Sequence, residues 1–318
     1  MPNFDLKLPE LKKYRGSSPR PGDFDAYWKK ALAELDGVPF KVELRKADFV
    51  HAKVEAFHLF FQGTGGARIH AKYLRPMESA GRAPAIASFH GYSAQSGSFS
   101  SYLPWLTLGY SVFALDCRGQ NGLSESTTPS TLGSFHGNLF RGIENPEHLL
   151  FRYIFLDAVQ LIRIAAKEKQ VDPKKIAVTG GSQGGGLALA AAALVPEVAL
   201  CAAGCAFLSD YKRVWELSEG RANDEINPYF QTHDPFHKRA DEIFGKLGYI
   251  DVQHLAPRIR ARTLMWVGLM DKVCPPSTVF AIYNKLKCKK KILVAPNQGH
   301  AHPWQWEDLA FGFLGKLG

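Results

Sequence analysis

One glycine-rich turn constrains this chain more than any other feature of its sequence. Residues 176–179 (Ile-Ala-Val-Thr) predict a buried strand, and residues 180–184 then read Gly-Gly-Ser-Gln-Gly. The next residues are almost all Gly, Ala and Leu, which predicts a closely packed helix. A nucleophilic serine in the pattern G-x-S-x-G needs this strand, turn and helix, because small neighbours allow the strained turn that exposes the serine. The alternatives are an ordinary glycine-rich turn or a phosphate loop, and the G-x-x-x-x-G-K-[ST] pattern of a phosphate loop is absent from the sequence.

From residue 84 onward, short apolar runs alternate with helical patterns. The predicted strands are residues 85–89, 111–115, 176–179, 199–203, 263–267 and 291–294; the predicted helices lie near 102–108, 149–168, from 183, and near 276–287. This alternation predicts an α/β protein with a mostly parallel central sheet and helices on both faces. Before this region, two runs of alternating polarity around residues 62–66 predict an antiparallel hairpin.

Two further segments have a different character. Residues 1–38 predict an arm followed by a helix, with Asp23 as the N-cap before Phe24. Residues 207–258 are polar and aromatic and predict a helical insertion after the sixth predicted strand, lying over one end of the sheet. We expect residues 1–318 to form a single domain. We expect four aromatic side chains of the insertion to be exposed and to form contacts between copies of the chain: Tyr211, Trp215, Tyr229 and Phe230.

Composition excludes several classes of protein. The 318 residues are 46% hydrophobic and 12% aromatic, which excludes disorder as the main state, and five cysteines are too few for a disulfide scaffold. Cys201 and Cys205 have no C-x-x-C partner, so we expect buried thiols and no metal site. The sequence has neither a signal peptide nor a membrane-spanning run, so we expect a cytoplasmic protein.

The net charge of +9 raises the question of an anionic partner. This charge is spread along the chain, and we expect no binding to nucleic acid or membrane. The densest cluster predicts a solvated face, with a polyanion site as the alternative: Lys285, Lys287, Lys289, Lys290 and Lys291.

A serine nucleophile requires a histidine base and an acid that orients this base. In hydrolases with the G-x-S-x-G turn, the chain order is serine, acid, histidine. Asp271 and His300 each follow a late predicted strand, and the carboxyl ends of such strands border the crevice of an open parallel sheet. We therefore predict a catalytic triad of Ser182, Asp271 and His300. His302 is the rival base, whereas three histidines precede the acid and fit poorly: His233, His237 and His254.

The oxyanion of an acyl-transfer reaction needs two backbone N–H donors. One comes from the residue after the serine, here Gln183, and the other from the loop after an early strand. Tyr92 is the candidate in that loop, within the run Phe89-His-Gly-Tyr92, which could also be a simple turn. Trp304 and Trp306 follow His300, and we expect them to pack in the core, with a pocket lining as the alternative.

Four motifs together resemble the acetyl xylan esterase / cephalosporin-C deacetylase family, carbohydrate esterase family seven. They are Phe89-His-Gly-Tyr92, Arg118-Gly-Gln120, Gly180-Gly-Ser-Gln-Gly184 and Gly268-Leu-Met-Asp-Lys-Val-Cys-Pro-Pro276. The likeness runs from about Phe24 to the C-terminus. It implies an α/β-hydrolase that removes acetyl groups from small sugars and similar esters without a metal or organic cofactor. It also implies a hexamer with a small-molecule ester as substrate.

The resemblance implies the same triad and oxyanion residues, and a structural role near the site for Arg118, Gly119 and Gln120. Two departures bear on the substrate: Ala301 stands where the family usually has Glu, and residues 204–210 lack the expected aromatic and proline pattern. A peptidase of the prolyl-oligopeptidase kind is the second interpretation, although the chain has no N-terminal repeat region. A receptor that keeps a hydrolase fold without catalysis is the third.

Overall fold

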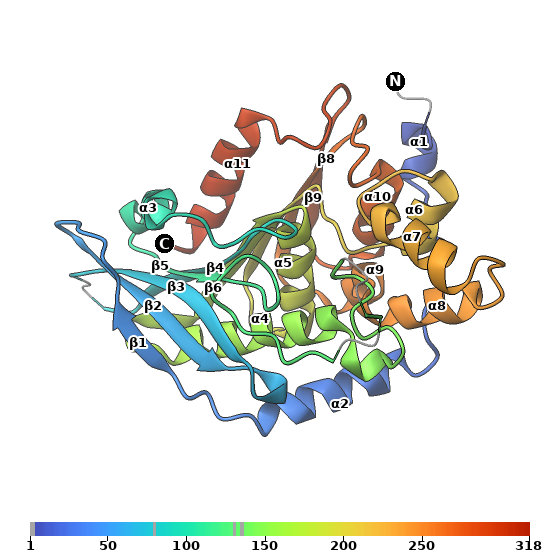
Figure 1. Ribbon diagram of the computed structural model, residues 1–318. Coiled ribbons are helices and arrows are strands. Elements are labelled where there is room, and N and C mark those ends of the chain that lie inside the picture. The colour runs from blue at the N-terminus through green and yellow to red at the C-terminus, as the bar shows by residue number, and fades with distance from the viewer. Residues whose placement is uncertain (1–3, 79–80, 130–131, 134–136) are drawn as a thin grey trace.

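The computed structural model describes residues 4–78, 81–129, 132–133 and 137–318. One sheet crosses the molecule in the order β1-β2-β3-β5-β4-β6-β7-β8-β9 (Figure 1). Its strands are β1 (Glu43–Lys46), β2 (Val54–Gln62), β3 (Arg68–Pro76), β4 (Ala83–Phe89), β5 (Ser111–Leu115), β6 (Val171–Gly181), β7 (Leu200–Gly204), β8 (Arg262–Gly268) and β9 (Lys290–Ala295). The helices are α1 (Leu8–Leu11), α2 (Phe24–Asp36), α3 (Leu103–Thr107), α4 (Leu150–Lys167), α5 (Gln183–Leu194), α6 (Tyr211–Leu217), α7 (Asn223–His233), α8 (Ala240–Leu247), α9 (Val252–Leu255), α10 (Pro276–Lys285) and α11 (Trp304–Leu314).

The sheet is mostly parallel, as the alternation of strands and helices predicts. β4 pairs in parallel with β5 and β6, and β7, β8 and β9 continue in the same direction. The predicted hairpin is confirmed as β2 and β3, which pair antiparallel, and β3 pairs antiparallel with β5. One edge strand, β1, was missed, because its four residues are all exposed and carry no apolar pattern. The insertion therefore follows the seventh strand and not the sixth, which corrects that prediction.

Two apolar layers cover the sheet. The larger packs α2, α4, α5 and α10 on one face, and the smaller packs α3 and α11 on the other. Figure 1 shows α3 and α11 above the sheet and α2 and α4 below it. Every residue of α5 is buried, which explains why this helix is apolar on all sides and contains only small and aliphatic side chains after Gln183.

The N-terminal arm and helix also follow the sequence pattern. α2 begins after Asp23, as predicted, and buries one face of the helix. The Asp23 carboxylate does not cap α2; it accepts a hydrogen bond from the Tyr249 hydroxyl instead. Upstream of α2, the Tyr14 hydroxyl and the Ser18 N–H donate to Asp210 at 2.8 Å each, so the arm is tied to the segment that leads into α6.

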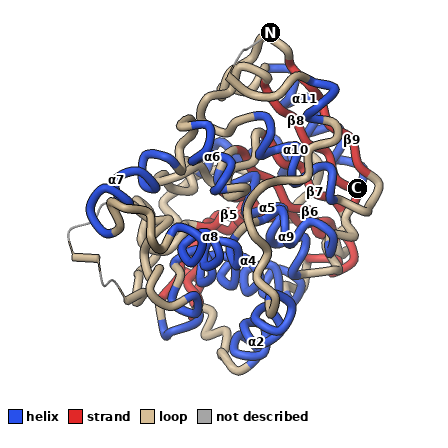
Figure 2. Tube along the Cα trace, turned by 90° about the vertical axis from the view of Figure 1, so that its right-hand side faces the viewer, coloured by secondary structure: helices blue, strands red, loops and turns tan. Residues whose placement is uncertain are grey.

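Residues 207–258 form α6, α7, α8 and α9, and Figures 1 and 2 show α6 to α8 gathered at one side of the molecule. The expectation of exposed aromatic side chains in this segment is wrong. Tyr211, Tyr229 and Phe230 are buried, and Trp215 packs on Phe230 and Phe244 with ring centroids 5.6 and 5.4 Å apart. The insertion covers its own aromatic residues, so they give no support to contacts between copies.

The lysine cluster is partly solvated and partly used inside the chain. Three of its side chains are exposed, whereas Lys285 donates to Gln253 Oε1 at 2.5 Å and Lys290 donates to the carbonyl oxygens of Tyr283 and Leu286. Among the described residues, none of the helices has the length and apolar character needed to cross a membrane.

Candidate active site

The carboxyl ends of six strands lie along one edge of the sheet. In register, Phe89 faces Leu115 and Gly180, Gly181 faces Gly204, and Gly268 faces Ala295. The loops that leave these ends are therefore neighbours, although they are up to about 200 residues apart in sequence. They carry the predicted site residues: Tyr92, Gln120, Ser182, Asp271 and His300.

Ser182 occupies a sharp turn between β6 and α5. Its backbone angles are φ 56° and ψ −121°, a strained conformation for a residue with a side chain. The turn is held by hydrogen bonds from Ser182 N–H to Gly204 O at 3.0 Å and from Phe207 N–H to Ser182 O at 2.9 Å. A Cβ at Gly180 or Gly184 would overlap backbone atoms, of Gly184 and Phe89 respectively. The flanking glycines are thus required by close packing, as the sequence pattern implies.

Asp271 and His300 are brought together. The buried Asp271 carboxylate accepts a hydrogen bond from His300 Nδ1 at 2.9 Å through Oδ2. Its other oxygen accepts from Val273 N–H at 2.8 Å and Cys274 N–H at 2.9 Å, which fixes the orientation of the carboxylate. Because a carboxylate only accepts, Nδ1 carries a proton, and in the neutral imidazole Nε2 keeps its lone pair.

The environment of His300 alters its basicity. Burial lowers the pKa of His300, but the hydrogen bond to Asp271 and contacts with the thiols of Cys205 and Cys274 outweigh burial and raise the pKa above its usual value. Among the hydrogen bonds of the described residues, none joins Ser182 Oγ to His300; in enzymes without substrate such bonds are often long. The rival base, His302, is exposed and pairs with Glu307 Oε1 at 3.0 Å, away from Asp271.

The two predicted oxyanion donors point from separate loops. Gln183 is the first residue of α5, where an N–H has no partner within the helix. Tyr92 lies in the loop after β4. Within the described part of the chain, neither the Tyr92 N–H nor the Gln183 N–H donates to a protein acceptor. Both remain available to a ligand.

The Arg118-Gly119-Gln120 segment links these loops. Gln120 and Gln183 exchange two amide hydrogen bonds, at 2.9 and 3.2 Å. Gln120 Oε1 also accepts from Ser93 N–H at 2.8 Å, beside Tyr92. Arg118 is fully buried and makes two 2.6 Å hydrogen bonds to the buried carboxylate of Asp157. The segment therefore fixes the loop of Tyr92 to the start of α5 and to α4.

Tyr92 is itself held by the insertion. Its hydroxyl donates to the buried Glu225 of α7 and accepts from Asn138 N–H at 2.9 Å. Its ring packs edge-on against Phe207, with centroids 5.6 Å apart. Burial raises the pKa of Glu225. The ring of Tyr92 is thus held in one orientation, and sequence patterns give no sign of the Glu225 contact.

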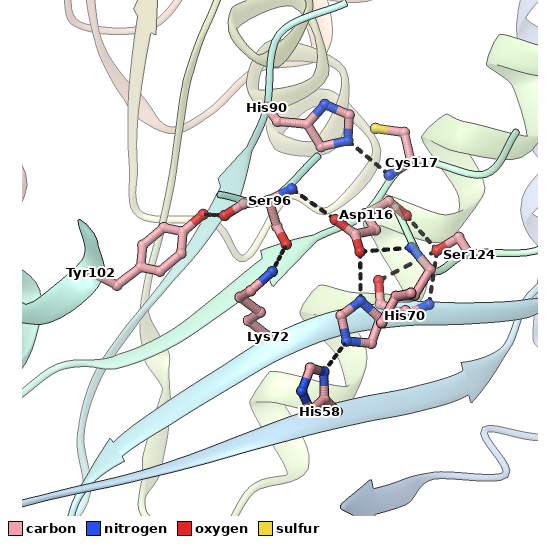
Figure 3. A network of polar contacts seen from close by, with 10 residues as sticks. His58, His70, Lys72, His90, Ser96, Tyr102, Asp116, Cys117 and Ser124 are labelled. Atoms are coloured by element: carbon pink, nitrogen blue, oxygen red, sulfur yellow. Dashed lines mark hydrogen bonds and ion pairs between the residues drawn. The ribbon is translucent and has the colours of Figure 1, made fainter. Parts of the chain in front are cut away.

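A buried network under the Tyr92 loop was also missed (Figure 3). Asp116, the first residue after β5, accepts hydrogen bonds from Ser96 N–H at 2.7 Å, Leu123 N–H at 3.0 Å and His70 Nδ1 at 2.6 Å. Burial raises the pKa of Asp116, but these hydrogen bonds outweigh burial and hold the pKa well below its usual range. His70 Nε2 lies 2.9 Å from His58 Nδ1, so the network continues toward the surface. The position of Asp116 at a strand end was the one available sequence signal.

The two tryptophans after His300 differ. Trp306 is buried and packs near Trp266, with ring centroids 6.4 Å apart, which confirms the prediction of core packing. Trp304 is 73% exposed, so the prediction of core packing is wrong for this residue. Its position at the start of α11 turns the side chain to the surface.

Comparison with known proteins gives consistent matches. A family model described as acetyl xylan esterase matches residues 1–317. An acetyl esterase of Xylanibacter ruminicola is 26% identical over 300 residues, and the match covers 92% of this chain and 66% of the length of that protein. The solved acetyl xylan esterase 1 of a Thermoanaerobacterium species is 46% identical, with a TM-score of 0.96 and coverage of 99% of both chains. An acetyl xylan esterase of a Paenibacillus species is 31% identical, with a TM-score of 0.94 and coverage of 98% and 99%.

More distant structures share only the fold. A prolyl endopeptidase structure matches with a TM-score of 0.61 and 18% identity, over 85% of this chain and 38% of that chain. The fold is therefore that of α/β-hydrolases, as the four motifs imply. Since the family model matches almost the entire sequence and two solved members superpose on it along nearly all of their length, the chain belongs to the acetyl xylan esterase family.

Proposed function

We propose that the protein is a serine carboxylesterase that removes short acyl groups, above all acetyl, from acetylated sugars and xylo-oligosaccharides. Related small esters such as cephalosporin C belong to the same proposal. The observation that carries it is the strained turn at Ser182, at the N-terminus of α5, together with the N–H groups of Gln183 and Tyr92, for which the described residues supply no acceptor. This is the arrangement that acyl transfer by a serine requires. Membership of the acetyl xylan esterase family supports the choice of substrate class.

The chemistry divides among five residues. Ser182 Oγ attacks the ester carbonyl and forms a tetrahedral intermediate, while His300 Nε2 takes the hydroxyl proton. Asp271 holds the imidazole in the required tautomer through the 2.9 Å hydrogen bond. The N–H groups of Tyr92 and Gln183 stabilise the oxyanion, each worth about 3 kcal/mol of the barrier. His300 then gives its proton to the leaving alcohol, and water cleaves the acyl-enzyme with His300 again as base.

The fixed ring of Tyr92 supports a short acyl group. The contacts of this ring with Phe207 and of its hydroxyl with Glu225 leave it little freedom to turn away from a longer chain. A rigid wall rejects extra methylenes more strongly than a soft apolar pocket, which distinguishes one methylene by only about 1–3 kcal/mol. The alcohol side faces the mouth of the site in this proposal and accepts varied leaving groups.

The test compares the purified protein and its Ser182→Ala variant on four substrates: p-nitrophenyl acetate, an acetylated xylo-oligosaccharide, cephalosporin C and a peptide anilide. We expect acetate release from the first three by the unmodified protein only, and no cleavage of the anilide. Cleavage of the anilide at a rate comparable with the esters would favour a peptidase. Failure to turn over any of the four would favour a binding protein that keeps the hydrolase fold.

A further inference from the structure

Two buried thiols lie beside His300 and have no part in the proposed reaction. Cys205 is the first residue after β7, and its N–H donates to Trp266 O at 3.0 Å. Cys274 lies in the loop between β8 and α10, and its N–H donates to Asp271. Both side chains are buried; the Cys205 thiol donates to the His300 carbonyl oxygen at 3.8 Å, and both thiols contribute to the raised pKa of His300. A histidine between two thiols and a carboxylate is an unusual surrounding for a general base.

The donor atoms of this cluster converge. The sulfur of Cys205, a carboxylate oxygen of Asp271 and a ring nitrogen of His300 all lie within 4.8 Å of one another. In a tetrahedral zinc site the metal lies about 2.3 Å from sulfur and about 2.0–2.2 Å from nitrogen or oxygen, which places the donors roughly 3.5 Å apart. Shifts of about 1 Å would close these three atoms around a metal ion. Cys274 lies three residues after Asp271 in the same loop, and its thiol would supply the fourth donor.

We propose that Cys205, Asp271 and His300, with Cys274 as fourth donor, bind a thiophilic divalent cation such as zinc or cadmium, and that this cation inhibits the enzyme. Thiolate, imidazole and carboxylate together are the donor set of zinc. Each thiol that binds loses its proton to solvent and forms a metal–sulfur bond. The metal replaces the hydrogen bond between His300 Nδ1 and Asp271: the Nδ1 proton moves through solvent to Nε2, and Nδ1 gives its lone pair to the metal. His300 can no longer take the proton of Ser182, so ester turnover stops until the metal leaves. The inhibition rests on the proposed function, whereas the binding does not.

The other cysteines provide controls. Cys117 and Cys201 are buried, and Cys288 is partly exposed and contacts Thr263 Oγ1 at 3.6 Å. Among the described residues, the Cys205 cluster is the one group of three or more such side chains that is close enough for a common metal ion. Cys288 is the thiol most open to solvent, so nonspecific binding of a metal ion to a thiol would occur there. Cys288→Ala therefore separates general thiol binding from the cluster.

The experiment measures both activity and binding. In chelator-free buffer, we first find the zinc concentration that lowers kcat/KM on p-nitrophenyl acetate tenfold in the unmodified protein. The same concentration should change the kcat/KM of Cys205→Ala less than twofold. Cys288→Ala should be inhibited like the unmodified protein, and excess EDTA should restore activity. Cadmium titration of the Ser182→Ala protein should give the ultraviolet charge-transfer band of a cadmium thiolate. The band should weaken when Cys205→Ala or Cys274→Ala is added to this variant.

Three results would overturn the proposal: equal inhibition of Cys205→Ala, loss of inhibition in Cys288→Ala, or no cadmium–thiolate band in the protein that carries both Ser182→Ala and Cys288→Ala. If Cys205→Ala does not fold, Cys274→Ala and Cys205→Ser take its place in both measurements. The cadmium band is read in a protein that lacks the proposed nucleophile. Failure of the metal site and failure of the proposed esterase function therefore give different results.

Discussion

Replacement of Arg118 by Met should destabilise the protein strongly, because it would leave the Asp157 carboxylate unpaired in the core. Both side chains are 0% exposed and are joined by two hydrogen bonds of 2.6 Å. Arg118 also donates to Thr64 O at 3.0 Å. Removal of one partner from a buried ion pair costs about 3–5 kcal/mol. We expect a loss of this size for Arg118→Met.

Thermal unfolding converts this loss into a measurable shift. With an unfolding entropy of about 2.1 cal/mol/K per residue, a chain of 318 residues loses about 5–7 °C in Tm for such a change. Circular dichroism at one fixed protein concentration measures the shift. Replacement of both partners, Arg118→Met with Asp157→Leu, removes the unpaired charge and should recover most of the lost Tm.

The pH dependence identifies the cause. Burial raises the pKa of Asp157, and the charge of Arg118 opposes this rise. Without Arg118, the folded-state pKa of Asp157 lies further above its unfolded value of about 4. The penalty is then greatest above the folded-state pKa and disappears as pH falls below the unfolded value. The loss of Tm in Arg118→Met should therefore become smaller as the pH is lowered from 8 to 5. Asp157→Asn leaves Arg118 without its carboxylate partner instead, so its loss of Tm should not become smaller over this range. A Tm loss under 2 °C, or a double variant no more stable than the single one, would refute this account of the pair.

Four further predictions concern activity and assembly. Ser182→Ala and His300→Ala should each lower kcat on p-nitrophenyl acetate by several orders of magnitude with the fold intact, since the two residues act as a unit. His302→Ala should lower kcat less than about threefold. The reverse ranking of the two histidine variants would make His302 the base. Because His300 must be neutral to act as a base and its pKa is raised, kcat/KM should fall as pH decreases through a value above 6.5, and a pH–rate profile that stays flat down to pH 6 would contradict this. Across p-nitrophenyl esters, kcat/KM should be highest for acetyl or propionyl and fall steeply by hexanoyl. A maximum at octanoyl or longer would show that the Tyr92 ring does not limit the length of the acyl group. We also propose self-association, with the hexamer that the family resemblance implies, which would cover exposed apolar side chains such as Val50, Phe236 and Trp304; light scattering at micromolar concentration that gives a 35.2 kDa particle would contradict it.

The parts of the fold predicted well are those in which residue type follows burial. Residues 176–178 of β6 and the part of α5 after Gln183 are buried and apolar, so the strand end and helix start near Ser182 could be placed from sequence. The polar first half of β6, from Val171, was missed. The four residues of β1 are exposed, and β1 pairs with β2 through backbone groups that do not depend on residue type. For this reason the sequence pattern did not predict β1. The aromatic residues of 207–258 were predicted to be exposed because the segment is polar overall. Their burial depends on how its helices pack together, which the sequence pattern does not show.

The proximity of Asp271 and His300 could be predicted because strand order and chain order constrain these two residues. Asp271 and His300 follow adjacent parallel strands, and this arrangement requires their loops to meet. Sequence cannot distinguish His300 from His302 by spacing alone, since both lie in one loop. The structure separates them by partner, because Asp271 contacts His300 and Glu307 contacts His302.

The support beneath the site was missed for a physical reason. The loop of Tyr92 is fastened at three points: Ser96 N–H donates to Asp116, Ser93 N–H donates to Gln120, and the His90 ring accepts from Cys117 N–H at 3.0 Å. In each case one partner is a backbone N–H, which every residue except proline has. The residue type at the donor position therefore cannot reveal the hydrogen bond. The position of the Tyr92 N–H thus depends on side chains from the loop after β5, and these side chains become recognisable only when β4 and β5 lie side by side. The Tyr92 N–H, which we propose as an oxyanion donor, could be named from sequence, but the contacts that hold its loop could not.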